Sequence, residues 1–345
     1  MLADDVAYVI GVDTHAESHT LALVETRTQR TRRSLSVPAT RRGYRHALRL
    51  ARRQAAGRRV WALEGSGSYG AGLARFLIER GELVLEVERP RREGRQGRLK
   101  SDALDAERAA RLLLSGRAGA LPRLDSKTQA LRGLLSTRAG AVTASTAAMN
   151  ELRALLLSAP PDVRERLQGL PRSSLLESCA RLRAGADSER SALALALRSL
   201  AKRIRALREE AEELEREIAR RVDERAPALL ERKGIGPICA ASLLIAWSEP
   251  RRVRSEAAFA RLAGVAPIPA SSGKVVRHRL DRGGDRRLNR ALHTIVLSRR
   301  RTDAETKAYI ARRVSEGKSE REAVRCLKRY LARSLFRALE AMPQT

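Results

Sequence analysis

Cysteines and aromatic residues are both scarce in this sequence. Its 345 residues contain only three cysteines, Cys179, Cys239 and Cys326, which are odd in number and far apart. They support neither a disulfide framework nor a zinc site, so they predict a protein of the reducing cytoplasm. Aromatic residues make up only 3% of the chain, which argues against a single-strand binder built on many stacking platforms.

Long hydrophobic runs are absent as well. No stretch of about 18 apolar residues occurs, so the sequence predicts no membrane-spanning helix. The first residues, MLADDVAYVIGVD, lack a basic segment and a small-residue cleavage site. We therefore expect no signal peptide and a cytoplasmic location.

Acidic residues are few compared with basic ones. Lysine and arginine total 69 residues against 40 aspartates and glutamates, so the formal net charge is +29. Only 8 of the basic residues are lysines, an arginine bias that codon usage in a G·C-rich genome would also produce. Because 43% of the residues are hydrophobic, the charge belongs to a folded protein. Nucleic acid is the first expected partner and an anionic membrane surface the second.

The first hundred residues have the pattern of an α/β domain. Apolar runs predict strands, and helical spacing predicts two helices between the later ones. Three hairpin-linked strands followed by helix, strand, helix and strand is the element order of the ribonuclease-H-like fold. The expected strands are Val6–Asp13, Thr20–Glu25, Ser34–Val37, Arg59–Glu64 and Glu82–Val87, and the expected helices lie within Arg41–Ala55 and Gly65–Gly81.

The next segments are a basic loop and a helix. RPRREGRQGRLK, at 89–100, has six basic residues in twelve and no apolar period. Ser101 is a candidate N-cap for a helix over 101–116.

The middle of the chain, from Leu124 to about Ala226, is helical in pattern. Its apolar residues step by four and three over four heptads, which indicates a coiled coil. We favour self-association through this element, and the alternative is a long antiparallel hairpin within one chain. The heptad residues are Leu193, Leu197, Leu200, Ile204, Leu207, Ala211, Leu214 and Ile218. A third, mainly helical region follows Pro227, and a capping box at Ser319–Glu322 opens its last helix.

Four carboxylates are candidate metal ligands. Asp13 and Glu64 each end an apolar strand, and a helix places Asp102 and Asp105 on one face. Carboxylates that converge at one sheet edge repel each other unless a dication lies between them, and hard oxygen ligands suit Mg²⁺ or Mn²⁺. Two such ions support phosphodiester chemistry. Each acid alone is more often a turn former or a solvated surface group.

A serine turn and an arginine cluster mark the C-terminal region. PIPASSG, at 267–273, places Ser271 and Ser272 before eight arginines that lie between Arg277 and Arg300. A turn beside an ordinary arginine-rich surface is the bland interpretation. The functional one is a nucleophilic hydroxyl, which needs a base or a metal to activate it, beside a polyanion-binding surface. No dedicated histidine is evident unless His278 serves.

Gly234-Ile235-Gly236 is similar to a helix-hairpin-helix element, whose backbone N–H groups contact a DNA phosphate. Lys233 stands where proline commonly precedes the glycines. The candidate nucleic-acid contacts are Lys100, Gly234, Gly236, Lys274, Arg277, Arg279, Arg282, Arg286 and Arg287.

Four stretches together resemble one family, the DEDD-type transposases of the insertion-sequence-110 family. These transposases are relatives of the Piv/MooV invertases and of the bridge-RNA-guided recombinases. The resemblance covers nearly the whole chain, and Ser101 stands where many members have threonine. The stretches are IGVDTHAESHTLALVE, ALEGSGSYGAGLARFL, GRLKSDALDAERAARLL and the C-terminal run EAAFARLAGVAPIPASSGKVVRHRLDRGGDRRLNRALH with EGKSEREAVRCLKRYLAR.

The resemblance implies a RuvC-like domain over 1–118, a helical oligomerisation region over 119–226 and a transposase domain over 227–345. Asp13, Glu64, Asp102 and Asp105 would bind the metal. Ser272, rather than Ser271, would be the nucleophile that forms a covalent phosphoserine link with DNA. The two sites would meet across the subunits of a homodimer or homotetramer.

The resemblance also implies double-stranded donor and target DNA as substrates, strand exchange through a junction, and a structured guide (bridge) RNA. Guidance by RNA would explain why no helix-turn-helix or zinc-finger reader is apparent. Two alternatives remain. One is a junction-resolving or other DNA nuclease that uses the same acids with a water nucleophile, and the other is a non-catalytic nucleic-acid-binding protein.

Overall fold

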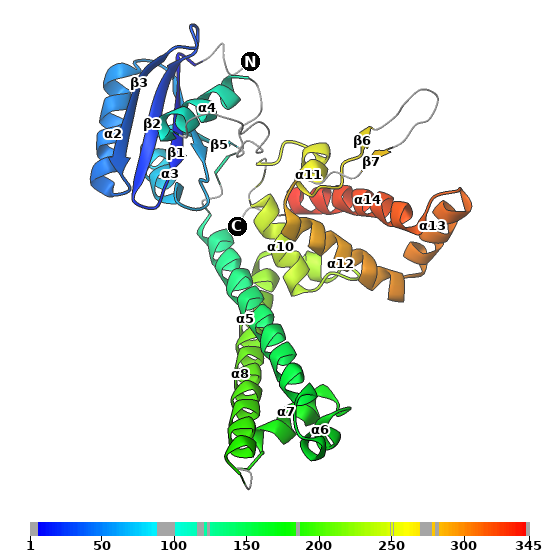
Figure 1. Cartoon of the computed structure of the whole chain (residues 1–345). Helices are drawn as coiled ribbons and strands as arrows, with labels where there is room; N and C mark the ends of the chain where they lie inside the picture. The colour runs from blue at the N-terminus through cyan, green and yellow to red at the C-terminus, as the bar shows by residue number, and fades with distance from the viewer. Residues whose placement is uncertain are drawn as a thin grey trace. The chain divides into compact units, whose positions relative to one another are not determined.

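The computed structural model describes residues 6–87, 101–115, 121–122, 125–183, 187–248, 250, 252–269, 278–279 and 283–342. Contacts divide the chain into two compact units. The first contains Met1–Thr128 and Ser248–Arg254, and the second contains Gln129–Trp247 and Ser255–Thr345. The first is built on a sheet and the second is mostly helical (Figure 1).

The first unit contains a mixed five-stranded sheet in the order β3-β2-β1-β4-β5. β1 pairs antiparallel with β2, and β2 antiparallel with β3, whereas β4 runs parallel to β1 and β5 parallel to β4. This topology is compatible with the ribonuclease-H-like fold that the sequence predicts. The strands are β1 (Tyr8–Thr14), β2 (Ser18–Glu25), β3 (Thr31–Pro38), β4 (Arg59–Glu64) and β5 (Leu83–Val87).

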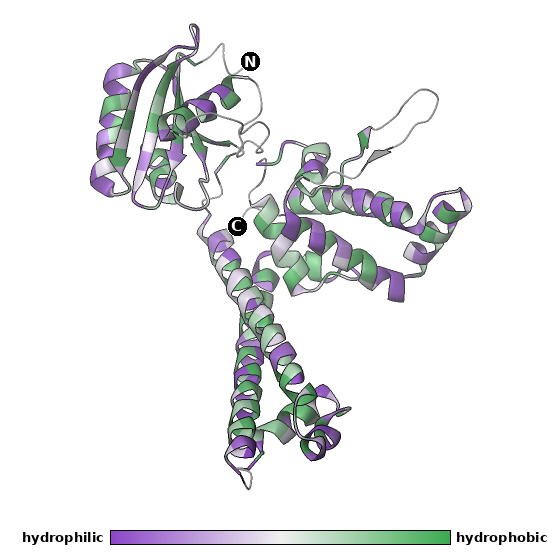
Figure 2. Cartoon of the chain, in the orientation of Figure 1, coloured by the Kyte–Doolittle hydropathy of each residue, from purple (hydrophilic) through white to green (hydrophobic). Residues whose placement is uncertain are grey.

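Helices cover both faces of this sheet (Figure 1). Side chains alternate between the faces of a strand, so Ile10 and Val12 of β1 pack with α2 (Arg41–Gln54) and α3 (Ala71–Ile78). Val9 of β1 instead packs with α4 (Asp102–Leu114). Figure 2 shows hydrophilic as well as hydrophobic residues along α2, and its buried residues form one face. Every strand and helix expected in this unit is present, with ends that differ by a few residues.

Helix α4 lies unusually close to β1 at Gly11. A Cβ atom at Gly11 would lie 1.9 Å from the carbonyl oxygen of Ala106 and 2.7 Å from the backbone nitrogen of Ala110. Both atoms belong to the backbone of α4, so neither can move aside as a side chain would. Ala106 and Ala110 are fully buried and small, which allows the same close approach from the helix side. Gly11 therefore sets the distance between β1 and α4.

Two long antiparallel helices, α5 (Ser126–Leu157) and α8 (Ser188–Arg225), form the first part of the second unit, and the first three residues of α5 belong to the first unit. Leu152 and Leu156 of α5 share one buried cluster with Leu197 and Ile204 of α8. Ion pairs join the two helices as well, between Arg138 and Glu215 and between Arg203 and Glu151. Two short helices, α6 (Pro161–Leu167) and α7 (Arg172–Ala180), contribute to the cluster.

The heptads of α8 thus bury hydrophobic residues within one chain. This arrangement is the intramolecular hairpin that the heptad pattern left open as an alternative. Self-association through this element stays a prediction.

The rest of the second unit is a bundle of helices with a two-stranded ribbon, and the strands of the ribbon are β6 (Ile268–Pro269) and β7 (His278–Arg279). α10, with the sequence PICAASLLIAW, is rich in hydrophobic residues and mostly buried (Figure 2). The expected capping box of Ser319 and Glu322 opens α14. Within the described residues, no helix is both long and apolar enough to cross a membrane. The helices are α9 (Pro227–Leu230), α10 (Pro237–Trp247), α11 (Glu256–Leu262), α12 (Arg286–Thr302), α13 (Ala304–Ser315) and α14 (Glu320–Glu340).

The close approach at Gly11 leads to a test. We expect Gly11→Ala to lower the stability of the first unit by about 1–3 kcal/mol, because the added methyl group must push α4 away from β1. Gly133→Ala is the matched control, since nothing lies within 4 Å of a Cβ atom at this position in α5. Alanine favours a helix over glycine, so the control should be neutral or slightly stabilising. Thermal unfolding followed by circular dichroism would measure both, and equal midpoints for Gly11→Ala and the unsubstituted protein would contradict this account.

Candidate metal centre and nucleic-acid surface

Asp13 and Glu64 lie at the carboxyl ends of neighbouring parallel strands. The register pairs Val12 of β1 with Leu63 of β4, so the two acids follow at the same edge of the sheet. They also continue the alternation of Val9 on β1 and Val60 on β4, which both face α4. The Thr14 hydroxyl donates a hydrogen bond of 2.8 Å to the Glu64 backbone carbonyl and joins the two strand ends.

Asp102 and Asp105 occupy the first turn of α4. Carboxylates are favoured there because the N-terminus of a helix carries a partial positive charge. Ser101 is the N-cap residue, as expected, but its side chain makes no capping hydrogen bond. Asp105 accepts a 2.7 Å hydrogen bond from Arg108, one turn further along the helix.

His15 joins this group and was not among the residues singled out from the sequence. Its Nε2 atom lies 3.1 Å from Oδ2 of Asp13 and 3.7 Å from Oδ1 of Asp102. The residue stands just beyond β1, two positions after Asp13. The D-T-H spacing is the signal that could have found it, because alternate residues of an extended chain lie on the same side.

The donor set of Asp13, His15 and Asp102 fits a divalent cation. One ligand atom from each residue lies within 4.8 Å of the other two. Asp13 is only 7% exposed, and a buried carboxylate is costly without a compensating charge. The chain has 29 more basic than acidic residues, yet within the described residues no arginine or lysine pairs with Asp13 or Asp102. A cation held by oxygen and imidazole ligands would supply that charge.

The structure brings together only part of the predicted tetrad. Asp13 and Asp102 belong to the three-residue set, and Glu64 and Asp105 do not. Glu64 lies at the neighbouring strand end, and Asp105 lies one helical turn from Asp102 with Arg108 as its partner.

Several predicted site residues lie outside the described residues. They are the candidate nucleophile Ser272, its alternative Ser271, and the basic residues Lys100, Lys274, Arg277 and Arg282. Of Arg279 only the backbone is described, in β7. In the sequence, the two serines fall between the paired strands β6 and β7.

Arg286 and Arg287 are exposed in the first turn of α12. The start of this helix is anchored to the end of α11, because the backbone N–H of Asp285 donates a hydrogen bond of 2.6 Å to the Leu262 carbonyl. The Asp285 side chain caps the helix through the backbone nitrogens of Arg287 and Leu288. The capped start therefore presents the two arginines toward solvent, as a phosphate-binding surface requires.

The Gly234-Ile235-Gly236 turn precedes α10, as the sequence predicts. Gly234 has a left-handed φ of 78°, and a Cβ atom there would lie 3.2 Å from the Ile295 carbonyl oxygen of α12. Both the turn and its packing therefore require glycine at this position. A Cβ atom at Gly236 would meet nothing within 4 Å, and Gly236 is exposed.

Comparison with known proteins agrees with this geometry. Residues 10–161 match a family described as "Transposase", of the DEDD type found in IS110 elements. Residues 226–311 match the family described as "Transposase IS116/IS110/IS902 family". A search of curated proteins found no match. The first match contains all four acids of the predicted tetrad, and the second contains the serine turn and the arginines of α12. The chain belongs to the IS110 family of transposases and is a DNA transposase/recombinase.

Proposed function

We propose that this transposase cleaves and exchanges DNA strands through a divalent-metal centre and a serine nucleophile. The observation that carries the proposal is the convergence of Asp13, His15 and Asp102 at the sheet edge, inside the region that matches the DEDD-type family. Glu64 at the next strand end and Asp105 on α4 complete the proposed tetrad. The family and the acidic cluster indicate a divalent metal, and Mg²⁺ or Mn²⁺ is proposed from the oxygen ligands.

Each residue has a defined part in this proposal. The bound metal would polarise the phosphate and stabilise the developing charge on its oxygens. Asp13, Glu64, Asp102 and Asp105 would hold the metal. His15, whose Nε2 atom lies 3.1 Å from the Asp13 carboxylate, would add an imidazole ligand beside it. The Ser272 oxygen attacks phosphorus and passes its proton to a base. As the new P–O bond forms, the bond to the leaving strand breaks. The number of phosphoester bonds is unchanged, so the bond energy is conserved and strand exchange needs no nucleoside triphosphate.

The proposed substrates are double-stranded donor and target DNA, read with the help of a structured guide RNA. The net charge of +29 supports a role in holding nucleic-acid backbones. The proposal includes a homodimer or homotetramer, in which Ser272 of one subunit would serve the metal centre of another.

The metal centre is tested by binding without DNA. We expect Asp13→Asn and Asp102→Asn each to weaken Mn²⁺ binding at least about tenfold, because each removes a charged ligand. His15→Ala should also weaken it roughly tenfold or more, because it removes the imidazole ligand. Titration calorimetry of Mn²⁺ on the full-length protein measures this directly. Glu165→Gln, an exposed acid on α6, is the control. Unchanged binding in Asp13→Asn and Asp102→Asn would refute the centre.

The serine is tested by trapping the covalent link. We expect Ser272→Ala to abolish a protein–DNA adduct that survives denaturing electrophoresis, because no hydroxyl remains to attack phosphorus. Ser271→Ala is the matched control, one residue away, and should retain the adduct. A nuclease that uses water would still cleave labelled DNA in the Ser272→Ala variant, and such cleavage would favour the alternative function.

RNA guidance is tested by purification. We expect the protein isolated from cells that carry the whole element to retain a discrete RNA transcribed from the flank of the gene. The reason is that the positive charge of the protein holds the RNA backbone during purification. Sequencing of the retained RNA measures this, with protein expressed without the flank as the control. Recombination at native sites by RNA-free protein would contradict it.

A further inference from the structure

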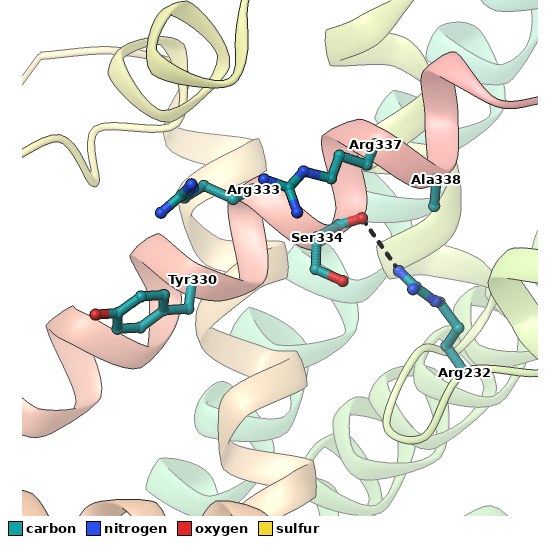
Figure 3. A pocket seen from close by; sticks show the side chains of 6 residues that line it. All are labelled: Arg232, Tyr330, Arg333, Ser334, Arg337 and Ala338. Atoms are coloured by element: carbon teal, nitrogen blue, oxygen red, sulfur yellow. Dashed lines mark hydrogen bonds between the residues drawn. The ribbon is translucent and has the colours of Figure 1, made fainter.

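A cleft of about 490 Å³ runs along α14 in the helical unit (Figure 3). Five of its lining residues lie on one face of α14, and the sixth comes from the segment before α10. Arginine side chains dominate this lining. The lining residues are Arg232, Tyr330, Arg333, Ser334, Arg337 and Ala338.

One carboxylate holds two of the arginines in place. Glu256 accepts a 2.7 Å hydrogen bond from Nε of Arg333 and another from Nε of Arg337. These two hydrogen bonds lower the pKa of Glu256 below its ordinary value. Three guanidinium groups against one carboxylate leave the cleft with a net positive charge.

The outer ends of these arginines are available to a ligand. Glu256 engages only the Nε atoms, and within the described residues the terminal Nη groups of Arg333 and Arg337 make no hydrogen bond. The two side chains are 42% and 66% exposed. Such fixed, open guanidinium groups match the geometry of a phosphate.

Arg232 approaches the same place from a different element. Its Nη1 atom donates a hydrogen bond of 3.4 Å to the Ser334 carbonyl, as Figure 3 shows. The contact places a third guanidinium group beside the outer face of α14. Charge from two distant parts of the sequence therefore gathers at one concave surface.

An exposed aromatic ring continues this surface. Tyr330 is 56% exposed, and its ring makes an edge contact with Tyr309 at a centroid distance of 6.0 Å. Arg312 lies over the Tyr309 ring at 5.5 Å. In a chain with only 3% aromatic residues, an exposed tyrosine beside an arginine cleft is the combination that binds a base by stacking and its backbone by charge.

We propose that this cleft binds a single-stranded segment of nucleic acid, with its backbone phosphates on Arg232, Arg333 and Arg337 and an unpaired base stacked on Tyr330. The stacked base must be unpaired because a base within a duplex has no free face. The inference deepens the proposed function by naming a ligand subsite. It rests only on the protein's acting on nucleic acid, and it needs neither the metal centre nor Ser272.

Fluorescence anisotropy on the full-length protein tests the cleft. The probes are labelled single strands of about 12 nucleotides, within the known range of such site sizes, one of RNA and one of DNA, and a DNA duplex. We expect Tyr330→Ala to weaken binding of one or both single strands at least about fivefold, the lower end of the effect of a base–aromatic stack. Tyr330→Phe should bind like the unsubstituted protein, because it keeps the ring.

The arginines are tested by salt dependence. We expect the double variant Arg232→Gln, Arg337→Gln to reduce the slope of log K against log salt on single strands by about 0.7 for each phosphate that the protein no longer neutralises. Arg166→Gln, an exposed arginine on α6, is the control for a change of charge alone. All variants should keep the circular dichroism spectrum, since the altered side chains lie at the surface.

Two results would overturn the proposal. The first would be that Tyr330→Ala binds single strands as tightly as the Arg166→Gln control and that the double variant also has the same salt slope as this control. The other is a weakening confined to the duplex. Strand exchange by Asp13→Asn and Ser272→Ala separates this proposal from the proposed function. If strand exchange does not depend on Asp13 or Ser272 while the cleft variants still bind single strands more weakly, the proposed function fails and the cleft proposal holds.

Discussion

The close packing of α4 against β1 is the contact on which the candidate metal centre depends. Three positions with little or no side chain, Gly11, Ala106 and Ala110, let the two backbones approach. Because side chains are short compared with the distance between a sheet and an ordinary helix, Asp102 would not reach Asp13 without this approach. A residue with no chemical function thus determines whether acids 89 positions apart in the sequence meet. His15 then lies between their carboxylates.

Pairing of charges distinguishes this centre from the rest of a strongly basic chain. Several glutamates elsewhere are held by arginines. Glu217 shows the effect most clearly, because hydrogen bonds from Arg220 and Arg221 lower its pKa to about 2. The buried Glu82 is also held by an arginine, Arg59, and by Trp61. Asp13 is buried with a histidine in place of an arginine. Because no arginine neutralises the Asp13 carboxylate, a bound metal ion can supply the compensating positive charge.

The helical unit shows how one sequence pattern admits two structures. A heptad repeat needs an apolar partner, but the repeat does not say whether the partner lies in the same chain. Here Leu197 and Ile204 pack against Leu152 of α5 within one chain. The spacing of apolar residues is a local property. The choice of partner depends on the connection that contains α6 and α7 and brings α8 back beside α5.

Local pattern determined much of this protein. Short apolar runs and helical spacing predict the strands and helices of the first unit, and the Ser319–Glu322 capping box predicts the start of the last helix. Each of these signals depends on neighbours a few residues away. The sequence also predicts that Asp13 and Glu64 each end a strand, and the structure shows that these two strands are neighbours. Only the tertiary structure decided that His15 joins Asp13 and Asp102, and that Arg232 meets the Ser334 carbonyl of α14. Those contacts join residues that no local period relates, so they exist only once packing has fixed the distances between whole elements.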